Sequence, residues 1–410
     1  MMGRFCHLYS GAFLEGHVTS RWDERIMVRK LIRHFDYSII VVSLLLMGFG
    51  LVMVYSSSTI VATTSGHAAD YFFLKQLFWA FVALGALIIG SIIPYKLYKA
   101  FVKPIIIITL ILLVLVLLVG ADINNAQSWF KIGSIQIQPA EFAKLSIIIY
   151  LASVFSNKQA YISEFKSSVL PPLIMTSLVF LLITMQPDLG SAMIIAGIAV
   201  MMILCSGIRM KHIIMLMAFA VIALSIIFTF SLSSEQESRF TSAYHPFDNN
   251  VRENGGWQLI NSYIAITSGG LTGKGLGDSV EKSGFLPEPH TDFIMAIVAE
   301  ELGILGVLFV IICIAYLVIR SILIGIRCQD VFGSLIAIGI GSFIGIQTLI
   351  NLGVVSGLLP ITGVTLPFIS YGGSSLVVLL FSMGMLVNVS GIVRMKEQSV
   401  EGEGESWEIK

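Results

Sequence analysis

The sequence predicts an all-α polytopic membrane protein with about ten transmembrane helices, both termini in the cytoplasm and one large extracellular loop. Three observations support this fold class: a composition unlike that of soluble proteins, long apolar runs, and an uneven distribution of Lys and Arg. Only 12% of the 410 residues are charged and 56% are hydrophobic, whereas soluble domains carry about 25% charged residues. A soluble globule of this composition would expose large apolar patches. Soluble enzymes are therefore excluded, and the net charge of zero argues against a nucleic-acid partner.

Ten apolar segments are long enough to cross the hydrocarbon core of a bilayer, which takes about 20 helical residues. In order they cover 37–58, 73–93, 101–120, 140–155, 168–186, 189–207, 211–231, 292–319, 332–355 and 367–391. The fourth segment is the weakest, because it opens with Glu141 and Lys144. The fifth and sixth segments are nearly continuous, since only a Gln-Pro-Asp turn separates them.

The distribution of basic residues predicts the orientation. With both termini inside, the cytoplasmic segments carry 18 Lys and Arg residues and the extracellular segments carry five. Basic segments stay in the cytoplasm, so this division also supports an even number of spans. The chain then divides into a cytoplasmic N-terminal segment 1–36, a membrane domain 37–393 and a cytoplasmic tail 394–410. The long extracellular loop 232–291 joins spans seven and eight, and such loops are uncommon unless functional.

Polar residues gather on the predicted outer side, first around span four. Glu141 and Lys144 are spaced i, i+3 and therefore share a helix face. Two interpretations stay open: an ion pair that anchors the helix end, or a lysine that presents its cation to an anionic ligand. Farther on, Asp188 precedes span six, where a carboxylate is favoured as a helix cap.

The large outer loop contains two recognisable features. Trp257, Ile260 and Ile264 recur at helical spacing, which predicts a short helix over 256–267 on the membrane surface. The glycine-rich segment 268–277 resembles a phosphate loop but lacks the Ser or Thr that must follow the lysine. It is therefore either a flexible loop or a turn whose amides approach a pyrophosphate.

The loop ends in Leu-Pro-Glu-Pro-His-Thr-Asp-Phe directly before span eight. Its two prolines stiffen the chain and direct Glu288, His290 and Asp292 at the mouth of the helix bundle. His290 and Asp292 alone are weak evidence for a metal site. A divalent cation beside Asp292 or Glu288 at a phosphate site is the more credible metal hypothesis.

Span eight itself carries two further carboxylates. Asp292 and Glu300 are two helical turns apart, broadly on one face, and Glu301 lies beside them. We interpret these three carboxylates as more charge than the anchoring of a helix requires. A Gly- and Pro-rich segment, 357–375, then interrupts the last apolar region, which is typical of a re-entrant or broken-helix site.

Five strings in this order resemble the SEDS family (shape, elongation, division and sporulation proteins), and most closely its FtsW branch. They are QPAEFAK (138–144), QPDLGSA (186–192), GGLTGKGLG (269–277), LPEPHTDFIMAIVAEELG (286–303) and GLLPITGVTLPFISYGGSS (357–375). The resemblance implies a peptidoglycan glycosyltransferase that polymerises lipid II on the outer face of the cytoplasmic membrane, in cell division. It also implies a class B penicillin-binding protein, a transpeptidase, as partner, together with other membrane proteins of division or elongation.

The resemblance carries over to individual positions. Asp292 matches the essential catalytic aspartate, and Glu288 and Lys144 match two further family positions. The chain departs from the family at Ser128, where many relatives carry a basic residue directly before the tryptophan of the 124–131 loop. Lys131, two residues beyond that tryptophan, is the candidate substitute.

The residues suit such a transfer, in which a sugar hydroxyl displaces polyprenyl pyrophosphate. The reaction needs a base at the hydroxyl and positive charge at the leaving group. Asp292 is the candidate base, and a divalent cation is the one cofactor considered, with no organic cofactor expected. The candidate substrate-binding residues are Lys144, Glu141, Lys131, Lys274, Arg252, Glu288, His290 and Glu300. Two rival functions stay open: a lipid II flippase or other transporter, and a non-catalytic scaffold for a transpeptidase.

Overall fold

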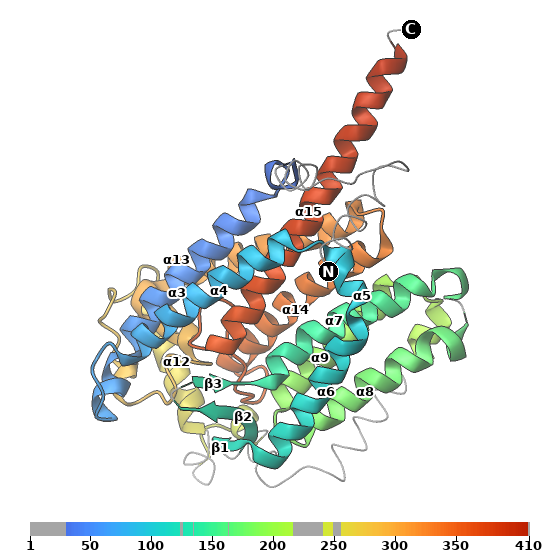
Figure 1. Ribbon diagram of the computed structural model, residues 1–410. Coiled ribbons are helices and arrows are strands. Elements are labelled where there is room, and N and C mark those ends of the chain that lie inside the picture. Colours follow the sequence, from blue (N-terminus) through green and yellow to red (C-terminus); the bar gives the residue numbers. More distant parts are fainter. Residues whose placement is uncertain are drawn as a thin grey trace.

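The computed structural model describes residues 30–123, 126–133, 135–162, 164–215, 241–248 and 256–408. Within these ranges the protein is a bundle of long helices that run roughly along one direction (Figure 1). A small β-sheet, helix α12 and the connection between α3 and α4 lie together at one end of this bundle (Figure 1). The predicted site residues within the described ranges lie on the elements and connections of this end.

Eight helical segments in the described part of the chain are long and apolar enough to cross a membrane. They are α3 (Tyr37–Thr64), α4 (Tyr71–Ile92), α6 (Val102–Val119), α7 (Pro139–Asn157), the π-helical turn η2 (Phe165–Val169) with α8 (Leu170–Thr184), α13 (Ile294–Arg327), α14 (Val331–Val355) and α15 (Gly373–Glu408). A ninth, α9 (Leu189–Cys205), is apolar but shorter. Each of the nine overlaps one predicted span, whereas most of the predicted seventh span, 211–231, lies outside the described residues.

The shorter elements connect these helices. The helix α5 (Tyr95–Ala100) precedes α6, and the 3₁₀ turn η1 (Gln159–Tyr161) follows α7. In the large loop, α12 (Trp257–Gly269) forms where a short helix was predicted, followed by the 3₁₀ turn η4 (Glu281–Ser283). Helix α15 continues without a break to Glu408 and so includes most of the predicted tail 394–410.

A small antiparallel sheet was not predicted. Its strands β1 (Ala121–Ile123), β2 (Ala126–Ile132) and β3 (Ile135–Ile137) are ordered β1-β2-β3. The sequence gives no clear strand signal here, since two of the strands have three residues each and alternation over so few positions is a weak signal.

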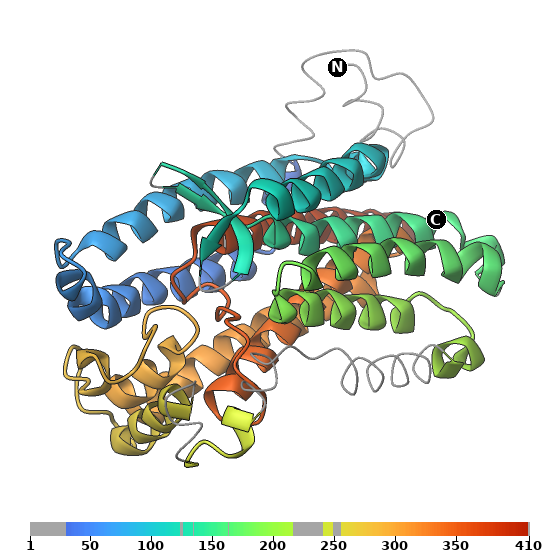
Figure 2. The same cartoon turned by 90° about the horizontal axis from the view of Figure 1, so that it is seen from below.

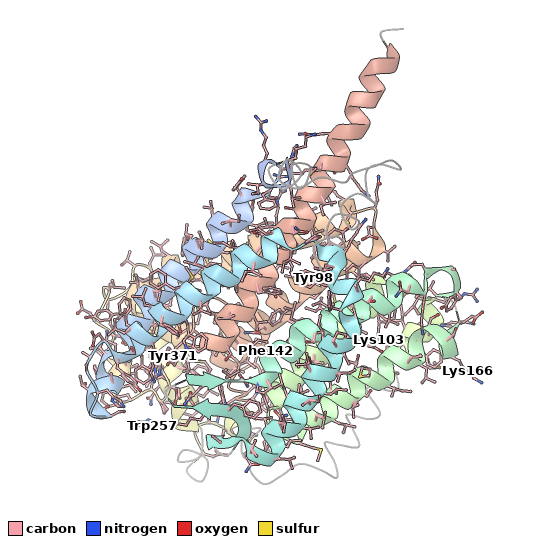
Figure 3. All side chains as sticks on the ribbon, viewed as in Figure 1. Tyr98, Lys103, Phe142, Lys166, Trp257 and Tyr371 are labelled. Carbon is pink, nitrogen blue, oxygen red and sulfur yellow. The ribbon has the colours of Figure 1, made fainter. Side chains whose placement is uncertain are left out.

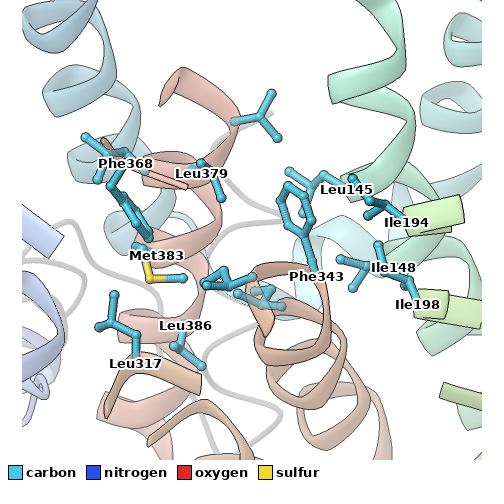
Figure 4. Packing of buried hydrophobic residues seen from close by; sticks show 14 of the residues in the cluster. Leu145, Ile148, Ile194, Ile198, Leu317, Phe343, Phe368, Leu379, Met383 and Leu386 are labelled. Atoms are coloured by element: carbon cyan, nitrogen blue, oxygen red, sulfur yellow. The ribbon is translucent and has the colours of Figure 1, made fainter. Parts of the chain in front are cut away.

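Three helices form the centre of the bundle. In their most apolar 18-residue windows, 78% of the residues of α7 and α14 and 83% of those of α15 are buried, against 22% for α4. Figure 4 shows how Leu145 and Ile148 of α7 pack near Phe343 of α14. The central position of α7 explains how a helix that opens with two charged residues is accommodated, because protein and not lipid surrounds it.

At the other end, one carboxylate ties three helices together. Asp36, just before α3, accepts from Arg320 of α13 at 2.6 Å and from Arg394 of α15 at 3.0 Å. Asp36 is only 3% exposed, and a buried carboxylate needs such partners. The cluster fixes α3, α13 and α15 relative to one another at this end of the bundle.

Helix α13 is broken at Gly303, and the glycine-rich loop repairs the break. Gly303 has φ 65° and ψ −162°, a conformation that only glycine adopts readily. The carbonyls of Glu300 and Glu301 accept from the amides of Lys274 and Gly275, each at 3.0 Å. Beyond the break, the amides of Ile304 and Leu305 donate to the carbonyls of Gly270 and Leu271. In Figure 2 the loop between α12 and α13 accordingly lies against α13.

We expect Gly303→Ala to destabilise the protein. A Cβ at this position would lie 2.5 Å from the amide nitrogen of Gly273, and the backbone conformation alone costs about 1–3 kcal/mol for a non-glycine residue. The apparent midpoint of thermal unfolding in detergent should fall by several degrees. Gly345→Ala in α14 is the control, because its Cβ would meet Val318 at an ordinary 3.6 Å. Equal midpoints for the two variants would refute the proposed role of the break.

Site-specific labelling tests the orientation. In a background without the native cysteines, a cysteine at Ser283 should react with a membrane-impermeant maleimide in intact cells, whereas one at Ala160 should react only after permeabilisation. Both residues are exposed. The nearby Ser279 is buried, so a cysteine there could fail to react whichever side of the membrane it lies on. The reverse labelling pattern would overturn the predicted orientation.

Candidate functional site

The candidate site lies where the large loop enters α13. Asp292 is 7% exposed, and one of its carboxylate oxygens accepts from the Thr291 hydroxyl at 3.0 Å. The same hydroxyl lies 3.0 Å from the carboxylate of Glu288, which is exposed. One hydroxyl hydrogen can serve only one of these oxygens at a time. Glu288 and Asp292 are therefore brought together at the Thr291 hydroxyl.

The backbone of Asp292 is held from α14. The side-chain amide of Asn351 donates to the carbonyl of Asp292 at 2.7 Å and to the carbonyl of Val364 at 2.8 Å. Asn351 is fully buried. This one side chain joins the loop that carries Asp292 to the irregular segment 356–372 between α14 and α15.

His290 lies in an aromatic cluster. Its ring centre is 4.5 Å from that of Phe72 on α4 and 5.6 Å from that of Tyr371. Its carbonyl accepts from the amide of Tyr371 at 2.9 Å. Burial lowers the pKa of His290, although the nearby Glu288 acts in the opposite direction. A neutral, packed imidazole fixes the loop against α4 and the segment before α15.

Glu141 and Lys144 form the predicted ion pair, at 2.8 Å. Lys144 is only 1% exposed and also donates to the side-chain oxygen of Gln347 at 3.1 Å. Gln347 in turn donates to the carbonyl of Thr365 at 2.9 Å. Of the two interpretations of Lys144, this geometry favours the anchoring ion pair, because its ammonium group points into the protein.

Glu300 anchors the large loop. Its fully buried carboxylate accepts from Lys274 at 2.7 Å, from the amide of Val280 at 3.0 Å, from the amide of Glu281 at 3.3 Å and from the hydroxyl of Ser279. Because four donors converge on it, Glu300 has no oxygen left for substrate. Lys274 keeps its side chain 33% exposed beside this carboxylate.

Glu301 serves the same purpose toward α3. It is fully buried, pairs with Lys282 at 2.7 Å and accepts from Ser56 of α3 at 2.7 Å. The interpretation that span eight carries more charge than anchoring requires was therefore wrong. Glu300 and Glu301 are both engaged in anchoring, because a buried carboxylate needs a cation and hydrogen-bond donors.

The glycine-rich turn is also structural. The amides of Lys274 and Gly275 complete the broken helix, so neither is directed at a pyrophosphate.

The other predicted positions are dispersed. Asp188 caps α9 by accepting from the amide of Ser191 at 2.9 Å, as predicted, Lys131 is exposed on β2, and Arg252 lies outside the described residues.

No three His, Cys, Asp or Glu side chains are grouped as metal ligands in the described ranges. Glu288 and Asp292 place two carboxylates around one hydroxyl, which resembles part of a metal site. Mg²⁺ is commonly held by one or two carboxylates with substrate phosphates and water completing the shell. This pair therefore fits a cation that arrives with a phosphate group.

Sequence reasoning missed three residues that organise the site. Gln76 of α4 donates to the carbonyl of Ser370 and accepts from the amide of Gly372, and Lys282 and Ser56 hold Glu301. A buried glutamine inside an otherwise apolar span is a detectable signal for Gln76. For Lys282 and Ser56 no signal existed, because 226 positions separate them in the chain.

Comparisons with known proteins agree with this geometry. Residues 36–395 match the family FTSW_RODA_SPOVE, described as cell cycle proteins. The chain is 50% identical over 388 residues to a probable peptidoglycan glycosyltransferase FtsW of Bacillus subtilis, covering 92% of this chain and 96% of that protein. It is 40% identical over 358 residues to stage V sporulation protein E of the same organism, covering 87% and 96%.

Two solved structures share the fold. One concerns the coordination of polymerization and crosslinking by a peptidoglycan synthase complex, with TM-score 0.71 and 25% identity over 87% of this chain and 97% of that chain. The other is the crystal structure of the rod shape determining protein RodA of Thermus thermophilus, with TM-score 0.63 and 24% identity over 87% and 96%.

The anchoring role of the buried pairs predicts the effect of Lys282→Met. The change leaves Glu301 buried without its cation, and breaking a buried pair in this way costs about 3–5 kcal/mol. We expect a clear fall in the apparent thermal unfolding midpoint in detergent. Lys131→Met, at an exposed lysine on β2, should leave the midpoint within error. If both variants unfold like the wild type, Lys282 does not anchor the loop.

Proposed function

We propose a mechanism for this chain from the premise that it belongs to the family of FtsW, RodA and SpoVE cell cycle proteins. It is a multi-pass protein of the bacterial cytoplasmic membrane and a peptidoglycan glycosyltransferase that acts in cell division. This family membership favours an enzyme over the transporter and the non-catalytic scaffold. Our proposal concerns the substrate, the catalytic residue and the partner.

The proposed substrate is lipid II, a sugar–peptide unit joined through a pyrophosphate to a polyprenyl chain. The 4-hydroxyl oxygen of one sugar forms a bond to the anomeric carbon of another unit. The bond between that carbon and the pyrophosphate oxygen breaks, and polyprenyl pyrophosphate leaves. The hydroxyl proton passes to a base, which we assign as Asp292.

One observation carries the assignment of Asp292: its position is fixed from three sides at the outer mouth of the bundle. Asn351 holds its carbonyl at 2.7 Å, Thr291 contacts its carboxylate at 3.0 Å, and His290 two residues earlier is packed between Phe72 and Tyr371. A base works efficiently when surrounding contacts hold it in the productive geometry. By contrast, Glu300 is enclosed by the loop.

Positive charge at the leaving pyrophosphate is the second requirement. Lys274 is the accessible lysine nearest in sequence to the loop end, although it already pairs with Glu300. We also propose that Glu288, which is exposed beside Asp292, would hold a divalent cation together with the substrate phosphates; the cation would neutralise the leaving group and leave Asp292 as the base. Loss of polymerisation in EDTA, restored by Mg²⁺, tests this part.

We propose a transpeptidase of the class B penicillin-binding type as partner. Support comes from the fold shared with a peptidoglycan synthase complex that coordinates polymerization and crosslinking. The chain also presents apolar side chains outward along α13, which a membrane-spanning partner helix can cover; among them are Ile304, Leu308, Ile312 and Ile319.

Asp292→Asn tests the catalytic assignment. The substitution keeps the size of the side chain and removes its charge, so expression and membrane insertion should be unchanged. Polymerisation of purified lipid II into glycan strands should fall by about 10²–10⁴-fold, the usual contribution of a general base.

Two controls accompany this experiment. Glu288→Gln removes the neighbouring carboxylate and should retain more activity than Asp292→Asn, because Glu288 is exposed and is not the proposed base. The Asp292→Asn protein should still co-purify with a transpeptidase from the native membrane. Near wild-type polymerisation by Asp292→Asn would end the assignment, and the absence of any transpeptidase in the wild-type preparation would contradict the proposed partner.

A further inference from the structure

We propose that Lys75, Tyr71 and His67 form a subsite on α4 that binds the pyrophosphate and the adjoining sugar of the lipid-linked substrate. This inference rests on the proposed function and adds to it a binding surface next to the loop that carries Asp292. It starts from a partly buried lysine and from the aromatic rings around it.

Lys75 lies in the second turn of α4, which begins at Tyr71. The partial positive charge at the N-terminal end of a helix gives a nearby cation no stabilisation. Among the described residues, none of the ion pairs includes Lys75. Its ammonium group donates to the Tyr71 hydroxyl at 2.6 Å and lies 4.3 Å from the centre of that ring. A partly buried cation whose contacts are with a neutral ring keeps its charge for an anionic ligand.

Aromatic rings connect this lysine to the candidate site. The imidazole of His67, which is exposed, stacks on Tyr71 with ring centres 4.1 Å apart and planes 7° apart. Tyr71 is next to Phe72, at 5.2 Å, and Phe72 contacts His290 at 4.5 Å. His290 precedes Asp292 by two residues. The rings therefore form a continuous path from the outer end of α4 to the proposed base.

The chemistry of this surface matches a lipid-linked sugar. Lysine is a strong point charge for phosphate, and its place near the start of a membrane-spanning helix is the level at which a lipid-linked pyrophosphate would lie. Aromatic faces provide an apolar surface for a sugar ring, with few polar groups to fix its orientation. In the proposed subsite the ammonium group of Lys75 contacts the pyrophosphate of the substrate. The neighbouring aromatic rings contact the sugar that is joined to this pyrophosphate.

A phospholipid headgroup also carries a phosphate, and a lysine near a helix end can extend to it. The two sources differ in their dependence on the bilayer. A subsite for the substrate acts in a bilayer of neutral phosphatidylcholine, whereas a headgroup contact depends on anionic lipid such as phosphatidylglycerol. The neighbouring rings fit the sugar-bearing ligand, because an apolar ring face can pack against a sugar ring.

The test measures lipid II binding by full-length protein in phosphatidylcholine vesicles, in the Asp292→Asn background so that no turnover occurs. Lys75→Met should raise the Kd about tenfold, in line with the loss of one charge-assisted hydrogen bond, and Lys75→Arg should restore much of the affinity. Tyr71→Leu, which removes the stacked ring, should also raise the Kd. The matched control is Lys103→Met, because Lys103 is an exposed lysine in the first turn of α6 and lies apart from Tyr371 in Figure 3.

With Asp292 intact, Lys75→Met should raise KM about tenfold and leave kcat within about twofold. An unchanged Kd, a fall in kcat alone, or a binding defect that occurs only with phosphatidylglycerol would each overturn the subsite. Failure of the wild-type protein to polymerise lipid II would instead count against the proposed function. The binding measurement remains interpretable in that case, because it requires no catalysis.

Discussion

Backbone amides and carbonyls inside a membrane must find partners within the protein, because no water reaches them there, and two irregular segments of this bundle depend on that requirement. In α13 the break at Gly303 leaves carbonyls and amides that the glycine-rich loop satisfies. Between α14 and α15, residues 356–372 leave the helical conformation. There the side-chain amides of Gln347, Asn351 and Gln76 donate hydrogen bonds to backbone carbonyls that have no helical partner.

The same contacts place the candidate site. Asn351 holds both Val364 of the irregular segment and the backbone of Asp292, so the repair of one segment also positions the proposed base. The loop that repairs α13 is tied down by Glu300 with Lys274 and by Glu301 with Lys282. A buried carboxylate is energetically costly unless it is paired with a cation, which explains why each of these glutamates is paired with a lysine. These buried polar groups stabilise the fold around the loop that carries the proposed base.

Many individual features followed from the sequence because they depend on neighbours along the chain. Nine of the predicted spans coincide with helices in the described residues, the cap at Asp188 formed as expected, and α12 forms where helical spacing indicated it. The ion pair of Glu141 with Lys144 is one of the two interpretations that the sequence left open. The sheet β1–β3 was missed because its strands are short. The purpose of Glu300 and Glu301 was not evident from the sequence because their partners lie outside α13: Lys274 is 26 positions from Glu300, and Ser56 is 245 positions from Glu301.

The sequence by itself determined that this chain is a polytopic membrane protein and that its unusual polar strings belong to one family, because hydropathy, charge asymmetry and motif order are local properties of the chain. Only the tertiary structure decided which charged residues stabilise the fold and which are placed to contact a substrate. That distinction depends on contacts between segments far apart in sequence, such as Asn351 with Asp292 and Phe72 with His290. Spacing along the chain cannot specify such contacts, since the packing of the helices brings these residues together.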